Sequence, residues 1–189
     1  MPQLRITEDR RWRDMMTRAG RFFQMRATAS DHAETARRIA VLRKSEVFAE
    51  IEDRELALLA TMFERRALKA GETLCKAGDE ANDVFVVASG RISVRGSRNH
   101  AGRLRKGGAL ATVKPGAVIG EYGLVTTDAR RTATLVAQGP AEILTLDYPR
   151  FRQFVLAYPQ CVLAMLGVTV DRLQRVMAHG QADARRPPR

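Results

Sequence analysis

The spacing of apolar residues changes twice along the chain and divides it into three parts. Up to about residue 66, apolar residues recur at three- and four-residue intervals, as on one face of a helix. Between residues 68 and 146 they fall in short runs punctuated by glycines, which is typical of strands. From Pro149 the helical spacing returns. The pattern predicts helices on either side of an antiparallel sandwich or barrel.

The N-terminal part predicts three helices. They are expected at about residues 7–26, 31–42 and 53–66. The first would place Trp12, Met15 and Phe22 on one face and arginines on the other. That apolar face could pack on its own domain, on a dimer or other partner, or on a membrane surface, and the pattern leaves all three open.

The middle part predicts short strands, and the last part predicts two helices. The strands are expected at 68–79, 84–88, 91–95, 109–113, 132–137 and 141–146. The two helices should be separated by a break near Pro159. Residues 179–189, which include several arginines and prolines, are expected to form a disordered tail.

Composition adds a strong positive charge to this picture. The 189 residues include 32 basic and 21 acidic ones, for a net charge of +11, which favours an anionic partner. Much of the excess lies in residues 1–26 and 95–106, an arrangement that suits a solvated surface about as well as a nucleic-acid face. Because the chain shows neither a secretory leader nor an apolar run long enough to span a bilayer, a cytoplasmic protein is expected.

The other residue types add little chemistry. Cys75 and Cys161 stand far apart, and the three histidines are scattered, so no disulfide framework or metal site is expected. We find no phosphate-binding lysine loop and no nucleophile grouping, and therefore expect no catalytic residues.

The segment 116–135 does not resemble an ordinary connection between strands. It combines several glycines, one carboxylate at Glu121 and the arginine pair Arg130 and Arg131. Glycines let a backbone approach a ligand closely, a helical turn presents free N–H groups, and an arginine can pair with two phosphate oxygens. A glutamate beside an anion needs another role, such as accepting a hydrogen bond from a sugar hydroxyl. A phosphate and a hydroxyl together indicate a nucleotide.

This segment resembles the phosphate-binding cassette of cyclic nucleotide-binding domains. The likeness rests on Gly120-Glu121 followed, after a variable loop, by Arg131-Thr132-Ala133, and it extends to the paired glycine turns of 71–79 and the closing helices. It covers about residues 45–178. The resemblance implies a β-roll of the catabolite activator type, a jelly-roll-like double-stranded barrel in an α+β chain, flanked by N-terminal helices and a C-terminal pair of lid helices.

The resemblance also implies a set of ligand contacts. Glu121 matches the family's ribose-binding glutamate, Arg131 its phosphate-binding arginine, and Thr132 a hydroxyl for the phosphate or base. Arg130 competes with Arg131 for the phosphate, but Arg131 directly precedes Thr132-Ala133, as the motif requires. Val176 occupies the position of a base-contacting threonine in the catabolite activator protein, so the choice between cAMP and cGMP stays open. The full expected set is Gly120, Glu121, Tyr122, Gly123, Leu124, Arg130, Arg131, Thr132, Ala133 and Val176.

The sequence thus favours a cyclic nucleotide sensor without catalytic activity. Its expected organisation is an Arg-rich helical extension at 1–44, the binding domain at 45–178 and the tail at 179–189. The ligand is cAMP or cGMP, no cofactor or metal is expected, and a protein partner or a second copy would dock on the N-terminal helices.

Three alternatives remain beside this interpretation. The β-roll could be a scaffold that serves protein interaction or dimerisation without binding nucleotide. Glu121 and Arg131 could form an internal ion pair. The basic segments could bind nucleic acid without specificity, although specific DNA reading is not expected because only about ten residues follow Met177, too few for a helix-turn-helix.

Overall fold

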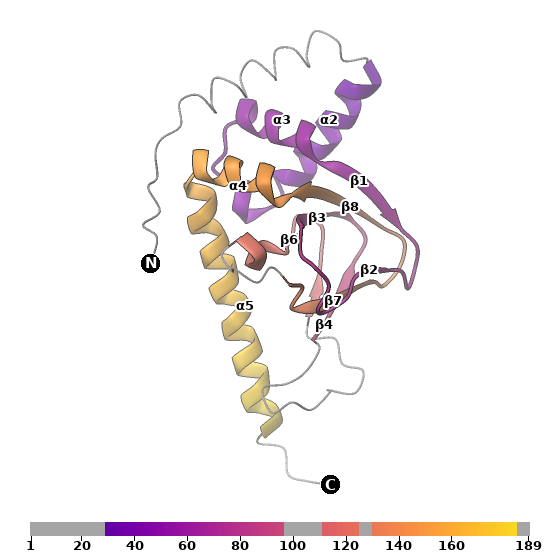
Figure 1. Cartoon of the computed structure of the whole chain (residues 1–189), viewed down its shortest axis with the longest axis vertical. Helices are drawn as coiled ribbons and strands as arrows, with labels where there is room; N and C mark the ends of the chain where they lie inside the picture. Colours follow the sequence, from indigo (N-terminus) through magenta and orange to yellow (C-terminus); the bar gives the residue numbers. More distant parts are fainter. Residues whose placement is uncertain (1–28, 97–110, 125–129, 185–189) are drawn as a thin grey trace.

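The computed structural model describes residues 29–96, 111–124 and 130–184 and shows two antiparallel sheets with helices along one side (Figure 1). The strand order is β1-β8-β3-β6 in one sheet and β2-β7-β4-β5 in the other. The strands are β1 (Glu64–Leu68), β2 (Thr73–Cys75), β3 (Asp83–Ser89), β4 (Ile92–Gly96), β5 (Ala111–Val113), β6 (Val118–Ile119), β7 (Ala133–Ala137) and β8 (Ala141–Asp147). The expected β-roll is confirmed, as two sheets that do not close into one barrel.

Helices precede and follow the roll, as the apolar spacing predicts. They are α2 (Ala29–Leu42), α3 (Asp53–Met62), α4 (Tyr148–Ala157) and α5 (Gln160–Ala184), with the short 3-10 helices η1 (Glu46–Phe48) and η2 (Glu121–Leu124). The expected break lies between α4 and α5, and η2 lies inside the predicted cassette. The first expected helix, at 7–26, lies outside the described residues, as does most of the basic segment 95–106.

Strand β3 explains how the roll and the helices share a core. Successive side chains of a strand point to opposite faces. Val84 and Val86 pack with the helices, whereas Phe85 and Val87 pack between the two sheets. The uninterrupted apolar run of this strand therefore reflects burial on both faces.

Two expected boundaries are corrected by the structure. The helix expected at 53–66 ends at Met62, and Glu64–Leu68 forms the edge strand β1 instead. Glu64 lies opposite Thr145 and Leu68 opposite Ala141, so pairing with β8 outweighs the helical propensity of this polar segment. The tail expected to be disordered from residue 179 is helical as far as Ala184, where Gln181, Ala182 and Ala184 are compatible with continuing α5.

The strand predictions were too long in one place and incomplete in another. Of the range 68–79, Leu68 ends β1 and the only further strand is β2, between turns in which Gly71 and Gly78 have φ angles of 78° and 91°. The two-residue strand β6 was not expected.

No single helix in the described part of the chain is long and apolar enough to cross a membrane. Only α4 taken with Gln160–Arg172 reaches that length and composition, and the two meet with a bend of 111°. The described residues contain no cluster of three or more metal-ligating side chains. Both cysteines are free, and burial raises the pKa of Cys161 to about 12.

Candidate functional site

The predicted cassette begins where strand β6 ends against strand β3. Val118 and Ile119 lie opposite Val86 and Phe85, and the chain then turns at Gly120 into η2. Gly120 has a φ of 93°, and a Cβ added there would lie 2.7 Å from Nη1 of Arg131. Only glycine combines this backbone conformation with so close an approach to the arginine.

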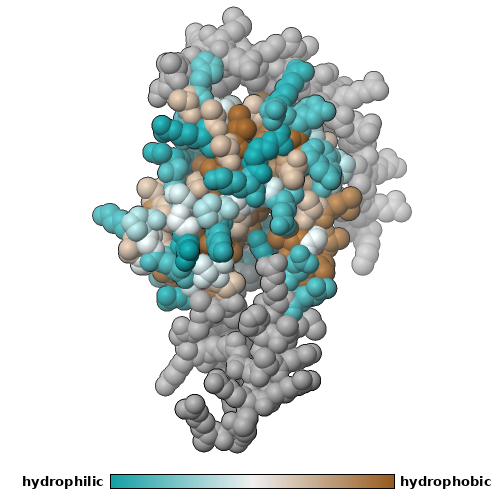
Figure 2. All heavy atoms as spheres, turned by 180° about the vertical axis from the view of Figure 1, so that it is seen from behind, coloured by the Kyte–Doolittle hydropathy of each residue, from teal (hydrophilic) through white to brown (hydrophobic). Residues whose placement is uncertain are grey.

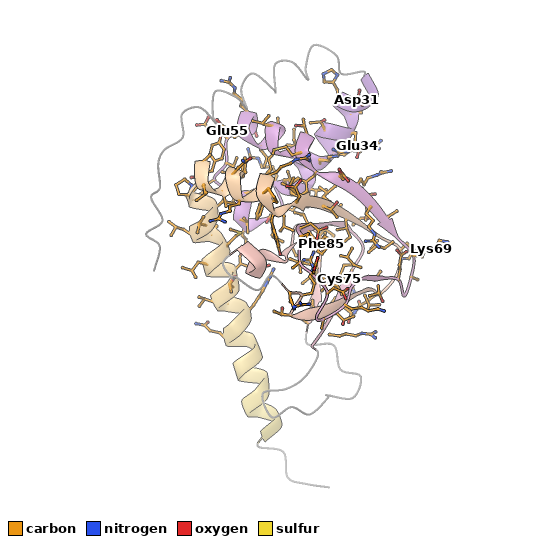
Figure 3. All side chains as sticks on the ribbon, viewed as in Figure 1. Asp31, Glu34, Glu55, Lys69, Cys75 and Phe85 are labelled. Atoms are coloured by element: carbon orange, nitrogen blue, oxygen red, sulfur yellow. The ribbon has the colours of Figure 1, made fainter. Side chains whose placement is uncertain are left out.

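Arg131 is held in place by its backbone and its side chain. Its N–H donates to the carbonyl of Asp79 at 2.8 Å, and its carbonyl accepts from Gly78 at the same distance. The residue is only 8% exposed, and its guanidinium lies 4.4 Å above the centroid of the buried Phe85 ring. Figure 3 shows Phe85 close to Cys75 inside the roll, and burial raises the pKa of Cys75 although the positive charge of Arg131 opposes this shift.

Asp83 supplies the protein's own partner for this guanidinium. Nη1 donates to the carbonyl oxygen of Asp83 at 2.9 Å, and Nη2 donates to its carboxylate, which also forms an ion pair with Arg131. These two bonds occupy one N–H of each terminal nitrogen. A guanidinium has five N–H groups, so Arg131 has further donors to offer.

One of those further donors has no partner. The N–H of Nε in Arg131 is buried and donates to no acceptor among the described residues. The N–H of Nε and the second N–H of Nη2 lie on the same side of a guanidinium and form the fork that binds two oxygens of an anion. Because leaving a buried donor unpaired is costly, the N–H of Nε is the donor of Arg131 that could still pair with an anion.

Glu121 lies at the start of η2 and has a different partner. Its side chain is 18% exposed, and Oε1 accepts a hydrogen bond from Nη1 of Arg172 at 2.6 Å. Nη2 of Arg172 also donates to the carbonyl of Val118 at 2.6 Å, so this residue ties α5 to the cassette. Glu121 and Arg131 thus have separate partners, and the internal ion pair considered from the sequence is not formed.

The structure describes the side chains of only some of the remaining predicted residues. Arg130 is exposed and donates to the carbonyl of Gly78 at 3.1 Å. Thr132 is exposed, and Ala133 is half-buried at the start of β7. Tyr122 and Leu124 lie in η2 and Val176 lies in α5, but their side chains are outside the described part of the structure.

Four residues contact Gly120, Glu121 or Arg131 but were not predicted as site residues. They are Asp83, Phe85, Tyr148 and Arg172. Tyr148 is the first residue of α4, and its hydroxyl donates to the carbonyl of Gly120 at 2.5 Å. No local motif marks these positions, because each reaches the cassette from a distant part of the chain.

A comparison with protein families identifies the same region. Residues 65–158 match the family described as cyclic nucleotide-binding domain. In sequence, the chain is 27% identical over 123 residues to the cyclic nucleotide-gated channel beta-3 of Canis lupus familiaris, which covers 64% of this chain and 15% of the channel. The chain therefore spans only a small part of such curated relatives.

Solved structures show the same fold. The catabolite activator protein of Thermus thermophilus superposes with a TM-score of 0.61 and 24% identity, over 74% of this chain and 63% of that protein. The cAMP-bound protein PfPKA-R superposes with a TM-score of 0.66 and 18% identity, over 83% of this chain and 51% of that one. At these identities the likeness concerns the fold alone.

Proposed function

Because the chain belongs to the cyclic nucleotide-binding domain family through residues 65–158, we propose that it binds cAMP or cGMP and does not transform it. The unpartnered Nε of Arg131 carries this proposal. A cyclic phosphate has one negative charge and two exocyclic oxygens, which suit the two parallel N–H groups of a guanidinium. Asp83 already occupies the end of that guanidinium, so the ligand completes the pairing of a buried charge.

Glu121 is the proposed ribose acceptor. Its Oε1 accepts from Arg172, but a carboxylate has two oxygens with about four acceptor positions in all, so a sugar hydroxyl can share it. Thr132 and the backbone N–H groups of 120–124 complete the proposed phosphate contacts. Val176 is the proposed neighbour of the base in α5.

The proposed output is a change in the position or order of α4 and α5. Arg172 connects α5 to Glu121, so a ligand that shares Glu121 changes what holds α5. Leu163, Leu166 and Val170 of α5 are 72%, 59% and 42% exposed. Figure 2 shows apolar surface on the side of the molecule where this helix lies, which offers a partner an apolar helix face.

The test is a calorimetric titration of the full chain with cAMP and cGMP, repeated on Arg131→Gln and Arg130→Gln. These neighbouring arginines are matched in charge, but Arg131 is buried with an unpaired Nε and Arg130 is exposed. We expect Arg131→Gln to lose on the order of 2–5 kcal/mol of binding free energy, because a desolvated phosphate loses its cation. Arg130→Gln should bind almost as well as the unchanged protein. Equal affinity of Arg131→Gln and the unchanged protein would contradict the proposal.

The competing function is a scaffold with an unused pocket. A binder gains about 2.7 kcal/mol of folding stability when free ligand is 100 times its Kd, which raises the Tm by several degrees. A scaffold that does not bind nucleotide gains no folding stability, and its Tm stays the same. A Tm unchanged by either nucleotide at millimolar concentration would therefore favour the interaction module.

A further inference from the structure

Tyr148 stands at the junction between the β-roll and the closing helices. It follows the last residue of β8 and begins α4, where the carboxylate of Asp147 accepts from the N–H of Arg150 at 2.8 Å. Its own N–H donates to the carbonyl of Asn82 at 2.9 Å. The backbone of Tyr148 is thus bonded next to Asp83, the residue that holds Arg131.

The side chain of Tyr148 reaches from this junction into the cassette. Its hydroxyl donates to the carbonyl oxygen of Gly120 at 2.5 Å. The N–H of Gly123 reaches the same oxygen at 3.3 Å, so one carbonyl is held from two directions.

The cassette closes tightly around the phenol ring. A Cβ added to Gly123 would lie 2.3 Å from the hydroxyl oxygen of Tyr148 and 2.6 Å from two ring carbons. No side chain fits in that space unless the ring or η2 moves. The contact between Tyr148 and the turn 120–123 therefore depends on glycine at position 123.

Holding the Gly120 carbonyl also sets the direction of the next N–H group. The described residues contain no cis peptide bond, and in a planar trans peptide the N–H of residue 121 points opposite to the C=O of residue 120. Because the carbonyl is bonded to the phenol, the N–H of Glu121 points away from the hydroxyl of Tyr148. The same peptide sets where the side chain of Glu121 begins.

The surroundings keep the phenol in its donating form. Burial raises the pKa of Tyr148, the positive charge of Arg131 opposes this shift, and the carboxylates of Asp83 and Glu121 add to it. The hydroxyl therefore stays protonated at neutral pH. These are the same three charged groups that form the candidate site.

We propose that Tyr148 is a positioning residue for the nucleotide site: its hydroxyl fixes the peptide between Gly120 and Glu121 and links that peptide to the first turn of α4. This inference rests on the proposed function. According to this inference, one hydroxyl both holds the cassette peptide in place and connects that peptide to α4. The ring packs against Gly123 in any case, so the role of the hydroxyl must be tested with the ring retained.

The variant Tyr148→Phe keeps the ring and removes the donor, and Tyr158→Phe is its matched control at the other end of α4, where the ring packs on Phe154. In calorimetric titrations of the full chain we expect Tyr148→Phe to raise the Kd for the bound nucleotide about threefold to tenfold, the usual effect of losing one hydrogen bond. Tyr158→Phe should leave the Kd unchanged.

A second readout separates positioning from general stability. In nitrogen-15 NMR spectra without nucleotide, Tyr148→Phe should shift the amide resonance of Glu121, whereas Tyr158→Phe should not. An unchanged Kd together with an unchanged Glu121 amide overturns the inference and leaves the proposed function intact. Failure of the unchanged protein to bind either nucleotide overturns both.

A third variant covers the case in which Tyr148→Phe does not fold. Replacing Tyr148 with a fluorinated tyrosine keeps the hydroxyl but makes it more acidic. Raising the pH through the pKa of that phenol then removes the donor within the folded protein. We expect the Kd to rise over that pH range in the fluorinated protein and to stay constant in the unchanged one. A Kd that does not respond to pH in the fluorinated protein overturns the inference.

Discussion

Arg131 is a buried cation whose carboxylate partner is Asp83, and this ion pair affects how strongly Arg131 binds an anion. Asp83 bonds both terminal nitrogens, and the face of the guanidinium lies over Phe85. The side chain of Asp83 is 38% exposed, so water weakens its field. Asp83 therefore orients the arginine and at the same time repels an incoming phosphate.

These two effects can be separated with Asp83→Asn. The amide oxygen can still accept from Nη2 and the backbone carbonyl is unchanged, so orientation is kept while the negative charge is lost. We expect nucleotide to bind about two- to fivefold more tightly, and the Tm without nucleotide to fall, because the buried arginine has lost its counter-charge. Calorimetry and thermal melting measure the two quantities.

The control is Asp53→Asn, which removes the same charge from an exposed site on α3. It should change neither quantity appreciably. Weaker binding by Asp83→Asn would show that orientation of Arg131 requires the full charge of the carboxylate.

At this scale the sequence marks the candidate residues of the segment 120–131 but not the distant residues that hold them. Gly120, Glu121 and Arg131 lie within one short segment, so a local sequence motif is enough to identify them. The supporting partners lie 28 residues from Gly120 at Tyr148, 48 from Arg131 at Asp83 and 51 from Glu121 at Arg172. Such contacts arise from the pairing of strands and the docking of α5, which no local pattern encodes.

At the scale of elements, the described side chains of α5 contact the rest of the chain through its packed start and through Arg172. Cys161 and Met165 are buried in the helix-side core. Further along, Arg172 bonds Glu121 in η2 and the carbonyl of Val118 in β6. Because Leu163, Leu166 and Val170 face solvent, the Arg172 contacts stabilise a helix whose opposite face is unsupported within the described chain.

We predict that Arg172→Gln loosens the middle of α5 in the absence of nucleotide. Glutamine is too short to hold both Glu121 and Val118, so local opening of the helix costs less free energy. Hydrogen exchange followed by mass spectrometry should show faster exchange of amides around residue 172. Asp171→Asn, at the neighbouring exposed position, should exchange like the unchanged protein. Equal exchange in both variants would mean that packing of Cys161 and Met165 alone orders α5.

Element boundaries show what local spacing misses. The helical pattern of α3 continues into 64–66, yet these residues pair with β8, because a sheet edge offers them hydrogen bonds that a longer helix would forgo. Strand β6 has only two residues and no alternation to detect. The core strand β3 was predictable because a strand buried on both faces is an uninterrupted apolar run. The break between α4 and α5 was predictable because a proline interrupts the helical pattern there.

At the scale of the whole molecule, the roll, the cassette and α5 meet on one side, where Figure 1 shows η2 between the sheets and the long helix. The chain carries a net charge of +11, and a cyclic nucleotide carries one negative charge. A positive field raises the rate at which an anion finds its site, and salt screens this field over about 10 Å at 0.1 M. The contacts inside the site are buried and are screened much less.

Salt should therefore act mainly on association. In stopped-flow measurements between low salt and about 0.5 M, we expect the association rate constant for cAMP or cGMP to fall severalfold and the dissociation rate constant to change little. Non-specific binding of duplex DNA should instead lose affinity by orders of magnitude over a similar range, because each phosphate contact releases counterions. An association rate constant that is independent of salt would show that the positive charge lies too far from the site to steer the ligand. If dissociation accelerates as strongly as association slows, the phosphate is bound at the solvated surface and Arg131 is not its partner.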